Sequence, residues 1–323
     1  MRLNKSFLEL YRPKQKEDIV GNKIIIERIF SQLYDKRLPN MILTGDAGIG
    51  KTSTAEVLAK EILGEKYYYE DCIIINCSDK TGVDFIRTEI IDTCSLKPLG
   101  KLRIWILEES EQLSKSAQKA MKKPLETPFD KSNRFIYLSN DLSKFIKPIV
   151  DRCRVYQFMP IKPEEMIDRL KFIRDEQKIN ISDDLLEYLS EISNGSMRYP
   201  IIQLEEFKSL NRKITKNDLR LEKSLEVIKE IFSLLKDRKI PIAKNKVLEL
   251  YQKGFYFKDI ARYFHDFTML SLGNDLNYEV KAKTLIKIAE SERDVNNGCN
   301  QFIVVSSLLS NISLLLQKTN NGD

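Results

Sequence analysis

Short apolar runs alternate with segments of helical periodicity through the first half of the chain. The runs are continuously apolar and are bounded by Gly, Pro or polar residues, as buried strands are. They are Met41–Thr44, Ile73–Ile75, Ile104–Leu107 and Phe135–Leu138. Continuous apolar strands separated by helices predict a parallel sheet that is covered on both faces. We therefore expect an α/β domain over residues 1–160.

After Pro160 the apolar runs give way to helical periodicity alone. Apolar residues recur three or four positions apart in three amphipathic segments, at residues 166–177, 183–193 and 201–210. These segments predict a second, small helical domain over residues 161–220.

Longer helical patterns follow as far as Gln317. Pro241, Gly254 and the polar tract at residues 294–300 interrupt them, and such residues commonly mark the ends of helices. The pattern predicts a third, all-helical domain over residues 221–323. Its last five residues, 319–323, are polar, and we expect them to be frayed.

Composition is typical of a soluble globular protein, with 42% hydrophobic and 31% charged residues among 323. The net charge of +6 comes from 53 basic and 47 acidic side chains, an excess that permits nucleic-acid binding without requiring it. No apolar run approaches the roughly 20 residues that span a bilayer. We expect an intracellular protein with no membrane partner.

The cysteines argue against a zinc site. None of the five forms a CxxC pair, and the single histidine, His265, has no cysteine near it in the sequence. Reduced, buried thiols are the better interpretation.

A glycine-rich loop from Gly45 to Thr52 fits the pattern GxxxxGK[ST] at every fixed position. It lies between a predicted strand and a predicted helix, the context that supports such a match. Backbone N–H groups of this loop surround phosphate oxygens, Lys51 reaches the terminal phosphates, and the hydroxyl of Thr52 binds magnesium. The loop therefore predicts binding of ATP and Mg²⁺ by Gly45, Asp46, Ala47, Gly48, Ile49, Gly50, Lys51, Thr52 and Ser53.

Polar residues follow two of the other predicted strands. Glu108 and Glu109 come directly after Ile104–Leu107; Glu108 would hold Mg²⁺ through water and Glu109 would act as the general base. Two carboxylates in this position can otherwise begin a solvated helix. Asn140, at the end of the next strand, would orient the attacking water, although asparagine is also an ordinary turn residue.

Spacing alone does not assign a role to three of the arginines. Arg152 flanks Cys153 and would be a surface charge by periodicity. Arg198 follows Gly195 and would begin a helix after a glycine C-cap. Arg87 follows a segment, Ser78–Gly82, that either caps a helix or meets DNA phosphates.

Taken in order, the motifs resemble those of a replication factor C small subunit, part of the sliding-clamp loader of the AAA+ class. The resemblance extends from about Leu10 to Gln317. The motifs are Tyr11-Arg12-Pro13, Ile19-Val20-Gly21, Leu38-Pro39-Asn40, the phosphate loop, Ser78-Asp79, Glu108-Glu109, Ala117-Gln118-Lys119-Ala120, Ser139-Asn140, Arg152-Cys153 and Gly195-Ser196-Met197-Arg198.

The resemblance implies a role for each residue that spacing left open. Clamp loaders of this family are five-subunit spirals with ATP sites between neighbours. Arg152 would be the arginine finger, which acts in trans on the ATP of the adjacent subunit. Asn140 would be the first sensor and Arg198 the second, which closes a helical lid over its own nucleotide. Arg12 would lie beside the adenine.

The resemblance also implies the partners. These are the other subunits of a hetero-pentamer, with the third domain as its oligomerisation collar, a sliding clamp, and primer-template DNA. DNA would be held by its backbone through basic residues inside the spiral, with Lys80, Arg87 and Lys122 as candidates. The expected compartment is the nucleus in a eukaryote and the cytoplasm otherwise.

Several positions depart from the family pattern. Asp46-Ala47 replaces two prolines, Glu108 replaces aspartate, Ser110-Glu111 replaces alanine-aspartate, and Asp151 replaces serine. Pro124 should end or kink the helix that contains Ala117-Gln118. One alternative is thus a scaffold subunit that holds ATP and hydrolyses it weakly. Another is a different AAA+ DNA machine, such as an origin initiator or helicase loader, which would carry an added winged helix.

Overall fold

A computed structural model describes most of the chain, which divides into two compact units, residues 1–214 and 215–323. The described residues are 5–32, 38–79, 82–126, 128–215, 218, 220–252, 255–270 and 278–318. Lys80 and the tail at residues 319–323 lie outside them. The predicted division of the first unit at residue 160 stays a prediction.

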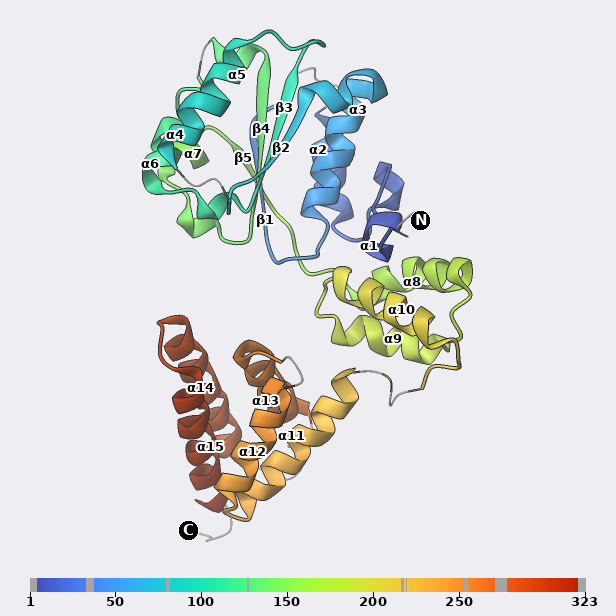
Figure 1. Cartoon of the computed structure of the whole chain (residues 1–323), viewed down its shortest axis with the longest axis vertical. Coiled ribbons are helices and arrows are strands. Elements are labelled where there is room, and N and C mark those ends of the chain that lie inside the picture. The colour runs from blue at the N-terminus through green and yellow to red at the C-terminus, as the bar shows by residue number, and fades with distance from the viewer. Residues whose placement is uncertain are drawn as a thin grey trace. The chain divides into compact units, whose positions relative to one another are not determined.

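The first unit is built on a five-stranded, fully parallel sheet (Figure 1). Its order is β2-β3-β4-β1-β5. The strands are β1 (Met41–Thr44), β2 (Cys72–Asn76), β3 (Arg103–Glu108), β4 (Asn133–Ser139) and β5 (Arg154–Gln157). The four strands expected from apolar runs are confirmed. The edge strand β5 was not predicted, because only Tyr156 of its four residues is buried.

Helices cover both faces of this sheet (Figure 1). On one side lie α2 (Lys23–Ser31) and α3 (Lys51–Asp71). On the other lie α4 (Val83–Phe85), η2 (Ile86–Ile91), α5 (Asp92–Ser95), α6 (Lys115–Ala120) and α7 (Lys147–Val150). The predicted α/β class is therefore confirmed.

Aromatic side chains fill the core between the sheet and this second layer. Trp105 stacks on Phe135 with ring centroids 5.8 Å apart, and its indole N–H donates to Asn133 Oδ1 at 3.1 Å. Trp105 is thus a packing residue with its one polar atom satisfied.

Short single-turn elements complete the first part of the chain. They are α1 (Phe7–Leu10), η1 (Lys16–Asp18), η3 (Ser110–Gln112), η4 (Phe129–Lys131) and η5 (Leu142–Lys144). Pro124 has the expected effect, because α6 ends at Ala120 and only turns follow it.

Three helices follow the sheet within the first unit: α8 (Pro163–Gln177), α9 (Asp183–Ile192) and α10 (Arg198–Leu210). We call them the helical lid. Gly195, in the turn before α10, has φ +78°, and a Cβ there would lie 2.4 Å from Pro160 Cβ. Only glycine fits this turn, which fixes where α10 begins.

The second unit is all-helical in its described residues. It contains α11 (Arg220–Lys236), α12 (Ile240–Gln252), α13 (Phe257–Leu270), α14 (Tyr278–Asn296) and α15 (Gln301–Lys318). Phe232 packs on Phe264 and Phe267, and Ser313 Oγ donates to the carbonyl of Leu235 at 2.8 Å. Pro241 lies in the first turn of α12, where its missing N–H costs nothing. No helix in the described ranges is both long and apolar enough to cross a membrane.

Candidate nucleotide-binding site

A cavity of about 540 Å³ opens where the carboxyl ends of β1, β3 and β4 meet. Ligands bind at this edge of open parallel sheets, because strand ends, loops and helix N-termini converge there. The phosphate loop, the N-terminal segment and the helical lid all contribute to its walls. The lining therefore combines residues that are far apart along the sequence, from Leu8 to Ile201.

The three glycines of the phosphate loop have backbone angles that other residues rarely adopt. Their φ values are +138° at Gly45, +79° at Gly48 and +100° at Gly50. A Cβ would lie 2.5 Å from the carbonyl oxygen of Phe158 at Gly45, and 2.1 Å from Ser196 Oγ at Gly48. The loop is thus packed against its surroundings in the conformation that a phosphate cradle requires.

Lys51 begins α3 and is only 9% exposed. Its ammonium group donates to the carbonyls of Gly45 and Asp46, the latter at 2.6 Å, and to Asn140 Oδ1 at 3.0 Å. The loop thus holds the ammonium group at the mouth of the phosphate cradle and within reach of the tip of β4.

The pKa of Lys51 is lowered to about 8, chiefly by burial. Glu111 and Asp46 oppose this shift, and the positive charge of Arg198 adds to it. Arg198 faces the same cavity, so two cations lie close enough to repel one another where a polyanion would bind. This repulsion is relieved when phosphates lie between them.

We expect nucleotide affinity to fall as pH rises through about 8. Below this pKa, Lys51 is charged before and after binding, so affinity is at its maximum. Above it, free Lys51 is neutral and must take up a proton to pair with phosphate, at a cost of up to about tenfold per pH unit. Titration of the chain with a fluorescent nucleoside triphosphate from about pH 7 to about pH 9.5 measures this. Lys51→Arg, which stays charged, should remove the dependence, and a flat wild-type profile would contradict it.

Two carboxylates stand at the end of β3, as the sequence predicts. Glu108 and Glu109 line the cavity together with Thr52. Glu109 has φ +49°, a conformation that is uncommon for a non-glycine residue and is often found at functional sites. Within the described residues, no cluster of three or more His, Cys, Asp or Glu could hold a metal. One hydroxyl and one carboxylate fit Mg²⁺, which usually takes its remaining ligands from phosphates and water.

Asn140 bridges two charged groups across this edge of the sheet. Its Oδ1 accepts from Lys51 Nζ at 3.0 Å, and its Nδ2 donates to Glu111 Oε1 at 3.0 Å. In the sequence, Glu111 stood out only as a departure from the family pattern. The carboxylate spacing in Glu108-Glu109-Ser110-Glu111 was the one available signal, and it did not show that Glu111 turns back toward β4.

The other end of the cavity is formed by the N-terminal segment. Arg12 lines it with Tyr11 and Pro13, and Arg12 Nη1 is 2.8 Å from Glu56 Oε1 on α3. Burial raises the pKa of Glu56, Arg12 opposes this, and Glu108 adds to it. Glu56 was missed because its spacing, four residues after Thr52, is ordinary on a helix. Apolar side chains of Leu8, Ile19, Val20, Ile161, Met197 and Ile201 also line the cavity, which suits a flat base.

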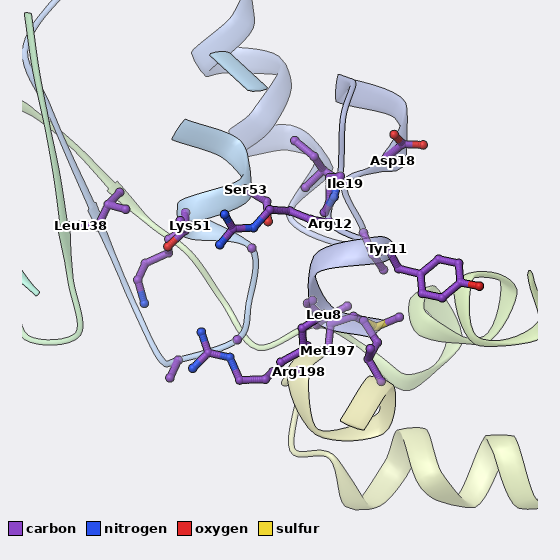
Figure 2. Close-up of a pocket in the computed structure, with 18 of the residues that line it drawn as sticks. Leu8, Tyr11, Arg12, Asp18, Ile19, Lys51, Ser53, Leu138, Met197 and Arg198 are labelled. Carbon is purple, nitrogen blue, oxygen red and sulfur yellow. The ribbon is translucent and has the colours of Figure 1, made fainter. Parts of the chain in front are cut away.

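The helical lid contacts the phosphate loop directly. The backbone N–H of Met197 donates to the carbonyl of Gly48 at 2.9 Å. Arg198 is the first residue of α10, and Figure 2 shows Lys51, Arg12 and Arg198 directed toward a common space. This bond joins the phosphate loop to the residue directly before α10.

Some predicted site residues lie outside the lining of this cavity. Gly45, Asp46 and Ile49 belong to the loop but not to the wall, and Ile49 is buried beneath it. Arg152 lies elsewhere: its Nη2 is 2.6 Å from Glu126 Oε1, and its Nη1 donates to the carbonyl of Pro148 at 2.9 Å.

Arg87 and Lys122 share a separate groove of about 560 Å³. Lys119 and Lys123 also line it, together with the acidic residues Asp92 and Glu126. Of the three predicted DNA-contact residues, the structure thus brings two together, and Lys80 lies outside the described part of the chain.

Gln118 connects the groove region to the segment that carries Arg152. Its Nε2 donates to the carbonyls of Leu113 and Lys144, at 3.0 and 3.1 Å, and its Oε1 accepts from the N–H of Ile146 at 2.8 Å. Gln118 is buried and joins α6 to the approach of α7. It belongs to one of the motifs that carry the resemblance, but the motif alone did not indicate this role.

Two family models match parts of this chain, and curated relatives match nearly all of it. The family model described as replication factor C C-terminal domain matches residues 224–311, and that described as DNA polymerase III, delta subunit, matches residues 21–162. The replication factor C small subunit of Methanothermobacter thermautotrophicus is 32% identical, covering 95% of this chain and 97% of that protein. That of Picrophilus torridus is 33% identical, covering 95% and 96%.

Solved structures agree on the fold. The Thermotoga maritima RuvB Holliday junction branch migration motor superposes with a TM-score of 0.55 at 15% identity, covering 78% of this chain and 84% of that one. The parallel sheet, the phosphate loop and the helical lid define a P-loop ATPase of the AAA+ class. Within that class, the chain belongs to the replication factor C small-subunit family.

Proposed function

We propose that this chain is a small subunit of a clamp loader that uses ATP binding and hydrolysis to load a ring-shaped sliding clamp onto primer-template DNA. The observation that carries the proposal is the grouping of Lys51, Thr52, Glu109 and Asn140 at one sheet edge. Near-full-length similarity to replication factor C small subunits supports the same function. The chain would act where the DNA is replicated, in the nucleus of a eukaryote and in the cytoplasm otherwise.

The residues of the cavity take separate parts in the reaction. Lys51 pairs with the terminal phosphates, and Thr52 and Glu108 would hold Mg²⁺, Glu108 through water. The metal neutralises charge on the β- and γ-phosphates when bound. Glu109 takes a proton from the attacking water, and Arg198 closes the helical lid over the phosphates. Arg12 and its apolar neighbours leave room for adenine.

The position of Arg152 supports a site that is shared between subunits. Its guanidinium group is not part of the lining of its own cavity, yet three of its five N–H groups have no acceptor in the described part of the chain. Such a group suits the phosphates of a neighbouring subunit in a hetero-pentamer. Residues 1–160 would then bind nucleotide, residues 161–220 would form the lid, and residues 221–323 would form the collar that joins the subunits.

Reconstitution tests the function directly. The complex of this chain with its partner subunits is expected to hydrolyse ATP faster when both primer-template DNA and clamp are added. A complex that assembles but shows no stimulation would contradict the proposal. Single-turnover hydrolysis separates it from a scaffold subunit, which would retain its bound ATP under these conditions. The described residues of the second unit contain no β-hairpin, which disfavours an initiator with a winged helix.

The groove that contains Arg87 and Lys122 is expected to hold backbone phosphates. Replacing either residue by alanine should weaken binding of the complex to DNA of any sequence. The slope of log affinity against log salt should become shallower by about 1 for each phosphate that is no longer neutralised. Lys131 is the control, because it is an exposed lysine that does not line the groove. An unchanged slope in both groove variants would contradict the assignment.

A further inference from the structure

Glu111 is a buried carboxylate to which the proposed reaction gives no part. It lies in η3, three residues after the end of β3, and is only 8% exposed. Its Oε1 accepts from Asn140 Nδ2 at 3.0 Å, while its buried Oε2 has no hydrogen-bond partner among the described residues. A buried carboxylate oxygen left without a donor costs stability. The presence of such a carboxylate in the folded protein requires a physical explanation.

The chemistry of its neighbours explains what Glu111 does. An ionised carboxylate only accepts hydrogen bonds, and the ammonium group of Lys51 only donates them. The amide of Asn140 lies between the two, and just one orientation satisfies both. Nδ2 must face Glu111, and Oδ1 must face Lys51, as the structure has it. Glu111 and Lys51 therefore together set which end of the amide faces the phosphate cradle.

The surrounding backbone is fixed by other contacts. Ser110 Oγ donates to the carbonyl of Leu138 at 2.8 Å and joins the end of β3 to the end of β4. The N–H of Asp141 donates to Ser139 Oγ at 3.0 Å. These bonds hold the main chain on both sides of Asn140 but leave the rotation of its amide free. Within the described part of the chain, the group that holds Nδ2 is the carboxylate of Glu111.

We propose that Glu111 is a positioning residue for ATP hydrolysis, which holds the Asn140 amide so that its carbonyl oxygen faces the attacking water. This inference rests on the proposed function. Water oxygen forms the bond to the γ-phosphorus as the bond to the β–γ bridging oxygen breaks, giving ADP and phosphate. One water proton passes to Glu109 and from there to the released phosphate. Asn140 Oδ1 accepts a hydrogen bond from the other proton.

Two single variants and their combination test whether Glu111 acts through Asn140. Glu111→Gln adds an N–H donor that can bind Asn140 Oδ1 and turn the amide over. In the reconstituted complex we expect Glu111→Gln and Asn140→Ala each to lower single-turnover hydrolysis about tenfold, the range for one hydrogen bond to a charged group. The double variant should lose no more than the more affected single variant, because the two residues act as a unit.

A binding measurement on the isolated chain gives a readout that does not depend on hydrolysis. Asn140 Oδ1 also accepts from Lys51, which is proposed to pair with the terminal phosphates. The preference for ATPγS over ADP should therefore fall by the same factor in both single variants and no further in the double variant, with ADP affinity unchanged within about twofold. Glu111→Asp keeps the carboxylate and should restore most of the preference. Glu65→Gln, on an exposed part of α3, is the matched control.

Different results separate the possible failures. Losses that multiply in the double variant would overturn the inference, as would an equal loss of ADP affinity. If Glu111→Gln does not fold, the Glu111→Asp variant provides the test. The inference would also be overturned if Glu111→Asp preferred ATPγS over ADP as weakly as Asn140→Ala does. A wild-type complex with no DNA-stimulated hydrolysis would instead contradict the proposed function, and the binding measurement would still test Glu111.

Discussion

Lys51→Ala is expected to weaken binding of ATP to this chain by about 100-fold. The substitution removes a charged donor that reaches the terminal phosphates, and such bonds are worth about 1.5–3 kcal/mol each. It also leaves the carbonyls of Gly45 and Asp46 and the amide oxygen of Asn140 without their shared donor. Titration of the isolated chain with a fluorescent ATP analogue in the presence of Mg²⁺ measures the loss.

The fold of this variant should survive. Burial disfavours the charge of Lys51, as its lowered pKa of about 8 indicates, so alanine removes a desolvation cost along with the hydrogen bonds. The thermal midpoint should therefore change little. Lys60→Ala is the matched control, because Lys60 lies on the same helix, half-exposed, and pairs with Glu65. Unchanged ATP affinity in a folded Lys51→Ala protein would show that the loop does not bind phosphate.

Three of the four strands that the sequence predicted are buried along most of their length, and the fourth, β2, is an edge strand whose apolar run is only partly buried. The runs at residues 41–43 and 104–107 are continuously apolar because helices cover the sheet above and below. Strand β5 was not predicted because it has no continuous apolar run, unlike the other edge strand, β2. It is an edge strand with three exposed residues, and its pairing with β1 depends on register rather than on composition. A local apolar run therefore indicates a strand, but it does not indicate which strand it pairs with.

The same distinction applies to the site. The phosphate loop is a contiguous motif, so its residues and their order could be read directly. The pairs Asn140–Glu111 and Arg12–Glu56 join positions that are 29 and 44 residues apart in the sequence. The spacing of neighbouring residues therefore does not predict either pair. Arg152 was ordinary by periodicity, and only the resemblance to a family gave it a role. Its pairing with Glu126, 26 residues away, required the structure.

One departure from the family pattern acquires a physical explanation. Ser110 replaces an alanine, and a buried hydroxyl is tolerated there because it donates to the carbonyl of Leu138. This bond also joins the strands that carry Glu109 and Asn140. Such a tie favours a subunit that hydrolyses ATP over a scaffold that only holds it, because a scaffold does not require these two side chains to be aligned.

Arg152→Ala should leave ATP binding by this chain unchanged within about twofold and lower hydrolysis at the neighbouring subunit's site by about a thousandfold. An arginine finger contributes roughly 10³ to 10⁵ in rate by stabilising charge in the transition state. The fold should not suffer, since the ion pair of Arg152 with Glu126 is 34% and 51% exposed, and pairs this exposed contribute at most about 1 kcal/mol.

The Arg152→Ala chain should occupy only one position of the reconstituted complex. Any loss of hydrolysis can then be assigned to a single ATP site. Single-turnover hydrolysis and bound-nucleotide analysis then report the two sites separately. Arg154→Ala is the matched control, because Arg154 is an exposed arginine only two residues further along and is the first residue of β5, whereas Arg152 precedes that strand. If Arg152→Ala reduced this chain's own nucleotide affinity as much as Lys51→Ala does, Arg152 would act in cis. The site would then be complete within one subunit, which the separation of Arg152 from the cavity lining argues against.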